Sequence, residues 1–180
     1  ACLVHQAEIY AMSGKLEHAR DTIRRADPLV RLGAPWALGD AYRLTGDLHL
    51  ALGEMDEAER CFQHAYQHGW DPYPGYAELL HLRGRGEEAI RGLERAATMS
   101  NWVAGERKAR YLAHAAQIAA MLGQREKARA LLHDLDTESR VPESGVTAAQ
   151  VLHARAELAW LDGETAEAQR RMHAAREVLQ

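Results

Sequence analysis

The sequence predicts an all-α protein built from repeated helix–turn–helix hairpins, and three observations support this. A glycine recurs at intervals of 39, 31, 39 and 40 residues, as Gly14, Gly53, Gly84, Gly123 and Gly163. Small and large residues recur in a fixed order around these glycines. The composition also favours closely packed helices over sheets. The chain has a single Phe, and its Val, Ile and Thr residues never form long alternating runs.

The segment Gly46–Ala65 shows the repeated unit most clearly. Its marker residues, at offsets of 0, 7, 12, 16 and 19, are Gly46, Gly53, Ala58, Phe62 and Ala65. We interpret Gly46 and Ala58 as small residues at a crossing of two helices. Gly53 ends the first helix, because only glycine enters the left-handed cap without a Cβ penalty. Phe62 and Ala65 recur at helical spacing and face the first helix. This spacing is typical of a tetratricopeptide (TPR) hairpin.

Five such hairpins follow one another along the chain. We predict them at Leu3–Ala26, Pro35–Gly69, Tyr73–Met99, Gly105–Leu135 and Val146–Leu179. A single hairpin would leave an apolar face in water, and stacking buries that face. We therefore predict one domain over residues 1–180, a TPR-like α-solenoid wound as a right-handed superhelix.

The predicted boundaries depend on prolines and glycines. We expect the first hairpin to end before Pro28, where a helix cannot continue, and to be followed by a loop over Asp27–Gly33. The next helix begins at Pro35, a good first helical residue, and extends to Leu52. The first helix of the third hairpin is the shortest. The most loop-like stretch is Asp136–Gly145, which contains two breaker residues.

The overall charge argues against nucleic-acid binding by this segment. Among 180 residues the net charge is −4, and phosphate contacts need a concentrated positive field. No apolar run approaches the ~20 residues of a membrane helix. Cys2 and Cys61 are the only cysteines, so we expect a reducing cytoplasm. The chain does not begin with Met, and we expect it to be part of a longer protein.

The sequence offers few candidates for chemistry. His64 and His68 are four residues apart, as in some zinc sites, but no third ligand is evident and both also suit a helix C-terminus. There is no phosphate-binding loop, no CxxC motif and no catalytic triad pattern. We therefore predict no catalytic, metal or cofactor site. A basic patch with interleaved glutamates reads as solvated ion pairs, and consists of Arg83, Arg85, Arg91 and Arg95 with Glu87, Glu88 and Glu94.

We predict that the first helices of the hairpins line a concave groove that binds a partner. The register places there Val4, Glu8, Met12, Arg43, Asp47, Leu50, Glu78, His81, Arg110, Gln117, Met121, His153, Glu157 and Trp160. A surface that mixes charges with Met and Trp suits a peptide, a helix or a small effector. Arg43 and Arg110 would pair with carboxylates of the partner, and Trp160 would cover an apolar part. Alternatively, Leu50 and Trp160 are core contacts, and the arginines pair with Asp47 or Glu106 within the chain.

Two segments carry a family resemblance. Cys2–Ile9, CLVHQAEI, and Gly69–Gly75, GWDPYPG, together with a long second and a short third hairpin, resemble the TPR-like region of large ATP-binding LuxR-type bacterial transcriptional regulators. The resemblance covers nearly the whole chain. It implies a non-enzymatic regulatory module whose partner is a protein, a peptide or another domain of the same regulator. It implies neither nucleotide nor DNA contact for any residue here. The alternative is a receptor for a small effector in the same groove, which requires an enclosed pocket of ~300 Å³ or more.

Overall fold

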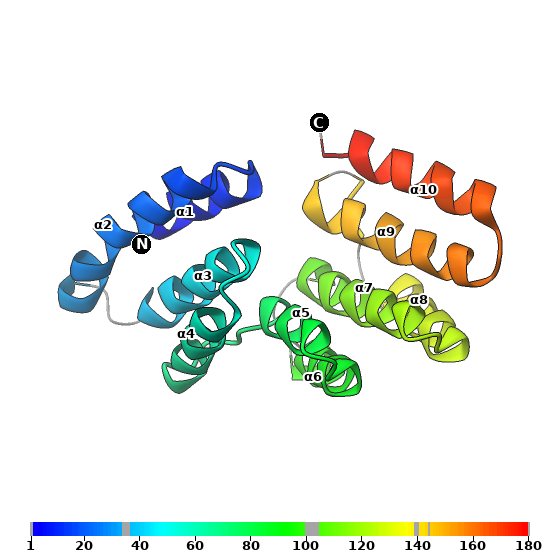
Figure 1. The fold of residues 1–180 in the computed structure, drawn as a ribbon, viewed down its shortest axis with the longest axis horizontal. Coiled ribbons are helices and arrows are strands. Elements are labelled where there is room, and N and C mark those ends of the chain that lie inside the picture. The colour runs from blue at the N-terminus through cyan, green and yellow to red at the C-terminus, as the bar shows by residue number, and fades with distance from the viewer. Residues whose placement is uncertain (1, 34–36, 100–104, 139–140, 144, 180) are drawn as a thin grey trace. The chain divides into compact units, whose positions relative to one another are not determined.

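The computed structural model describes residues 2–33, 37–99, 105–138, 141–143 and 145–179, which form ten α-helices and no strand (Figure 1). The predicted all-α, TPR-like solenoid class is confirmed. The chain divides into two compact units, Ala1–Leu79 and Leu80–Gln180. A single domain and a right-handed superhelix over all five hairpins stay predictions. In the described residues, no helix is both long enough and apolar enough to cross a membrane.

The first unit consists of two complete hairpins and the start of a third. Its helices are α1 (Cys2–Met12), α2 (Leu16–Gly33), α3 (Leu38–Ala51), α4 (Met55–Gln67) and the beginning of α5 (Gly75–Leu82). Within it, α1 packs on α2, α2 packs on α3, and α3 packs on α4. Side chains from the first three helices form one apolar core, which includes Val4, Ala7, Ala19, Ile23, Val30, Leu44 and Leu48.

The second unit is organised around α7. Its helices are α6 (Gly86–Met99), α7 (Gly105–Met121), α8 (Arg125–Glu138), α9 (Val146–Leu161) and α10 (Thr165–Glu177). Helix α7 packs against α6, α8 and α9, and α9 packs against α10. Such close contact is possible because α7 buries small residues, among them Ala109, Ala113, Ala115, Ala116 and Ala119.

The turn glycines behave as the sequence predicts. All five have positive φ, between +70° at Gly14 and +82° at Gly163. After α3, the amide of Gly53 donates to the carbonyl of Leu50 and the amide of Glu54 donates to that of His49. A left-handed residue at this point satisfies the last carbonyls of the helix and reverses the chain into the next one.

The predicted helix crossing is also confirmed. A Cβ atom on Gly46 would lie 2.6 Å from the ring of Phe62, so a larger residue does not fit there without movement of the ring. Phe62 and Ala58 are fully buried and pack with Leu79 in one cluster. In the second unit, Ala116 occupies the repeat position of Gly46, and it is fully buried too.

One predicted loop is wrong over its whole length, and another is wrong at its first residues. Helix α2 continues through Pro28 to Gly33, over the whole of the expected loop Asp27–Gly33. A proline inside a helix costs about 3 kcal/mol, but the same segment buries Val30 in the apolar core, and burial of a valine recovers about 1.5–3 kcal/mol. Helix α8 likewise includes the first three residues of Asp136–Gly145.

The other boundaries fall close to the expected ones. Helix α5 has 8 residues and is the shortest described helix, as predicted. Helix α3 is described from Leu38 onward, and the expected start at Pro35 lies outside the described residues.

Candidate interaction site on the first helices

A cluster around Arg43 joins α1 and α3 in the first unit, and we call it the arginine cluster. Arg43 Nη2 lies 2.9 Å from Glu8 Oε1 and 2.8 Å from Asp40 Oδ1, and Nη1 lies 2.8 Å from Asp47 Oδ2. The Arg43 side chain is only 13% exposed. Burial alone would lower the pKa of Arg43, but the carboxylates of Asp47, Asp40 and Glu8 raise it above its ordinary value. The guanidinium is therefore a fixed cation whose partners lie within the chain.

A second cluster joins α7 and α9 in the second unit, and we call it the histidine cluster. Its members are Gln117, Gln150, His153 and Glu157. His153 Nε2 lies 3.2 Å from Glu157 Oε1, and Gln117 Nε2 lies 3.4 Å from the His153 ring nitrogens. The amide of Gln150 donates to Gln117 Oε1. Apart from Glu157, this cluster consists of neutral or titratable groups.

The two clusters occupy the same positions of the repeat. Arg43 and His153 each lie ten residues before the turn glycine of their hairpin. Each contacts the residue six positions before the turn glycine in its own hairpin and the corresponding residue of the preceding hairpin. These contact residues are Asp47 and Glu8 for the first cluster, and Glu157 and Gln117 for the second. The same backbone positions therefore hold an arginine with carboxylates in the first unit and a histidine with amides and one carboxylate in the second.

Arg110 and His114 lie on α7 close to the histidine cluster. Burial, together with the positive charges of Arg110 and His153, lowers the pKa of His114 to about 3. His114 is thus a neutral imidazole at physiological pH. Arg110 Nε is buried and has no hydrogen-bond partner among the described residues. A buried donor without a partner costs free energy, so Arg110 would gain from an acceptor that reaches Nε after the side chain rearranges.

The fifth hairpin carries a family match. Residues 149–179, which contain most of α9 and all of α10, match the model of the tetratricopeptide repeat. The fold is a TPR-like helical repeat. No curated protein is significantly similar to the sequence. TPR repeats generally mediate protein–protein interaction, which fits a polar surface shared by neighbouring hairpins.

The remaining residues of the predicted groove are dispersed over this TPR-like fold. Val4 is buried in the core and does not line a surface. Leu50 is half-buried against the Phe62 cluster, as the alternative interpretation held. Trp160 is 65% exposed and is not a core residue, and Met12 and Met121 are exposed as well.

Two further predicted residues, Glu78 and His81, lie on α5. Glu78 is exposed, and His81 is half-buried with its Nδ1 atom lacking a partner. The structure thus groups the predicted residues into two sets, Glu8 with Arg43 and Asp47, and Gln117 with His153, Glu157 and Arg110. A single groove across all five hairpins stays a prediction.

Three residues were missed in the sequence, of which Asp40 and Gln150 belong to these clusters and His114 lies beside one of them. Asp40 and Gln150 lie thirteen residues before their turn glycines, the same position as Arg110. That shared offset was a usable signal. His114 carried no such signal, because its importance comes from burial beside Arg110.

The other candidates are explained by local contacts. His64 and His68 both lie against Tyr42, with ring centroids 5.0 and 5.6 Å away. In the described part of the chain, no three His, Cys, Asp or Glu side chains are grouped to hold a metal ion. In the basic patch, Arg85 pairs with Glu88 as predicted, whereas Glu94 reaches Lys127 of α8.

Proposed function

We propose that this chain is a non-enzymatic interaction module that binds a protein or peptide through the histidine cluster and the adjoining Arg110. The observation that carries the proposal is the buried Nε of Arg110, which has no partner among the described residues. Arg110 lies close enough to His114 to lower the pKa of that imidazole, and His153 acts on the same imidazole. A carboxylate from a partner would supply the missing acceptor and would be favoured by the positive charge.

The surroundings of Arg110 support a peptide with both acidic and apolar residues. Gln117 and Gln150 hydrogen-bond mainly to each other and to His153, and neutral amides exchange partners at little electrostatic cost. Met121 and Trp160 are exposed at the C-terminal ends of α7 and α9. Binding energy concentrates in a few residues such as Trp and Arg, so these residues are the expected anchors.

The resemblance to LuxR-type regulators supports a specific context for this module. In that context it belongs to a bacterial transcriptional regulator in the cytoplasm, and its partner is another protein or another domain of the same regulator. Contacts with DNA and with nucleotide would be made by other parts of such a regulator.

The test is a comparison of Arg110→Ala with Arg107→Ala, an exposed arginine on the same helix. The purified chain is screened against an array of short peptides that combine Asp or Glu with apolar residues, and the tightest binder is titrated by fluorescence anisotropy. We expect Arg110→Ala to weaken binding by about tenfold, or ~1.4 kcal/mol, and Arg107→Ala to leave it unchanged.

Circular dichroism melts of both variants control for folding. Equal affinity of the two variants, or the absence of any peptide binder, would refute this assignment of the site.

A further inference from the structure

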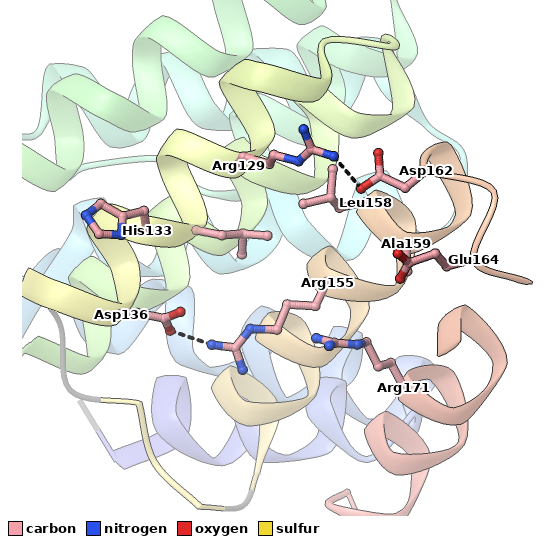
Figure 2. A pocket seen from close by; sticks show the side chains of 10 residues that line it. Arg129, His133, Asp136, Arg155, Leu158, Ala159, Asp162, Glu164 and Arg171 are labelled. Atoms are coloured by element: carbon pink, nitrogen blue, oxygen red, sulfur yellow. Dashed lines mark hydrogen bonds and ion pairs between the residues drawn. The ribbon is translucent and has the colours of Figure 1, made fainter. Parts of the chain in front are cut away.

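A pocket of about 350 Å³ lies among α8, α9 and α10, apart from the histidine cluster (Figure 2). Leu132, Leu158 and Ala159 give it an apolar lining. Figure 2 shows Arg155 and Arg171 around the same opening, reaching it from α9 and α10. The volume falls in the range of small-molecule sites. The alternative interpretation of the sequence put a small effector in the groove formed by the first helices, so this pocket is a different site.

The two arginines keep hydrogen-bond donors available. Arg155 pairs with Asp136 through Nη2, and Arg171 pairs with Glu167 through Nε at 2.6 Å. A guanidinium has five N–H donors in a planar fork. Each arginine is therefore held in place by one carboxylate and still presents N–H groups to a second acceptor.

Glu164 lines the same pocket, and its side chain does not cap the helix that follows it. It is the residue before α10, yet its side chain makes no capping hydrogen bond. The residues that follow the turn glycine in three other hairpins, Glu54, Arg85 and Gln124, all have side-chain partners. Among the described residues, the Glu164 carboxylate has none. It is a free anion at a pocket edge.

The charges of the pocket select the kind of ligand. Its lining contains three arginines and three carboxylates, so the formal charges balance. Asp162 is already held by Arg125 at 2.5 Å and by Arg129 at 2.9 Å. A highly charged anion such as phosphate would face Glu164 without a compensating excess of positive charge. A neutral molecule with separated positive and negative groups fits this balance.

We propose that the pocket binds a small zwitterion with an apolar side chain, of the class of the α-amino acids. Its carboxylate accepts hydrogen bonds from the free N–H groups of Arg155 and Arg171. Its ammonium group donates to Glu164. Its side chain covers Leu132 and Leu158. This site is independent of the peptide surface proposed above.

The experiment is isothermal titration calorimetry of the whole chain with free leucine as the probe. Three further probes each test one group: leucinamide lacks the carboxylate, 4-methylpentanoate lacks the ammonium group, and inorganic phosphate is a simple anion. We expect leucine to bind, and each of the other probes to bind at least about tenfold more weakly. Leucinamide leaves the two arginines without a carboxylate, and 4-methylpentanoate leaves Glu164 without an ammonium group.

Variants locate the binding. Arg171→Gln and Glu164→Gln should each weaken leucine binding at least about tenfold. Arg170→Gln is the matched control, because Arg170 pairs with the same Glu167 but is 70% exposed and does not line the pocket. If Arg171→Gln fails to fold, Glu164→Gln decides alone, since the Glu164 side chain loses no partner in the part of the chain that the structure describes.

Three results would overturn the proposal: no leucine binding tighter than about 10 mM, equal binding by Glu164→Gln and the unchanged chain, or tighter binding of phosphate than of leucine. None of these results bears on peptide binding by Arg110, so the two proposals fail separately.

Discussion

The arginine cluster and the histidine cluster use one position of the repeat for different purposes. In the first unit, Arg43 is 13% exposed and its guanidinium is surrounded by three carboxylates. In the second unit, the His153 side chain is 34% exposed and has one carboxylate neighbour and weaker contacts with amides. The first arrangement satisfies a permanent charge within the chain. The second leaves amides that exchange partners and, in the adjoining Arg110, a donor that lacks a partner among the described residues.

Under the function proposed above, this difference separates stability from binding within one helical repeat. The backbone positions that join the first helices of neighbouring hairpins are the same in both clusters. Filling them with Arg, Asp and Glu produces a cross-link between α1 and α3. Filling them with His and Gln, beside Arg110, produces a surface with hydrogen-bonding capacity to spare. The two clusters should therefore respond in opposite ways to mutation.

The largest expected effect is on the stability of the first unit. Arg43→Met removes the cation and leaves Glu8, Asp40 and Asp47 close together and partly buried. Breaking a buried ion pair costs about 3–5 kcal/mol, and these carboxylates keep some exposure, so we expect a loss of about 2–3 kcal/mol in urea denaturation. His153→Met should cost less than about 1 kcal/mol, because only one carboxylate, Glu157, loses its partner and the other groups are neutral amides.

The matched control is Arg60→Met, which removes an exposed ion pair with Glu57. Such pairs contribute about 0–1 kcal/mol. If Arg43→Met proved no more destabilising than Arg60→Met, the arginine cluster would not be a cross-link, and the contrast between the units would be lost.

A second pair of substitutions tests the packing that the units share. Ala58→Leu and Ala116→Leu each place a large side chain at a fully buried position. Overpacking costs about 1–3 kcal/mol, and we expect both variants to melt at clearly lower temperature. Ala130→Leu, at an exposed position of α8, should leave the melting temperature nearly unchanged. Tolerance of leucine at either buried site would mean that the helix crossing there is looser than the structure shows.

The fold was predictable because its main determinants are local. Gly53 must adopt a positive φ for the chain to reverse, and Gly46 must be small beside Phe62. Both requirements leave a mark at fixed spacing in the sequence. Pro28 was misread because the local rule against proline is outweighed by burial of Val30 against residues further along the chain. No local pattern shows that contact.

The site was predictable only in part, for a related reason. The register assigned Glu8, Arg43 and Asp47, and likewise Gln117, His153 and Glu157, to one predicted groove, and the structure shows that each of these sets is in contact. It gave Arg43 and Arg110 the same role as ligand anchors. Whether an arginine is already paired depends on which carboxylates surround it in the fold. Arg43 has Asp40 and Asp47 on its own helix and Glu8 on α1, whereas Arg110 Nε has no partner among the described residues.

The smallest expected effect sharpens the comparison through pH. The folded-state pKa of His114 is lowered to about 3, against about 6.5 in an unfolded chain. Between these values the unfolded chain binds the proton more tightly, so His114 contributes stability above pH 6.5 that is lost as the pH falls towards 3. At pH 7 the proton-linked contribution of His114 to the free energy of unfolding is already complete, so His114→Gln should remove almost no pH-dependent destabilisation. At about pH 5.5 it should remove a destabilisation on the order of 1 kcal/mol. Urea denaturation at several pH values gives the slope, and His173→Gln, at an exposed position of α10, is the control.

An NMR titration of the His114 ring adds a direct test, because Arg110→Met removes a positive charge and should move the pKa of His114 upward. An unshifted titration in that variant would mean that burial alone keeps His114 neutral, and Arg110 would then lose its electrostatic link to the histidine cluster.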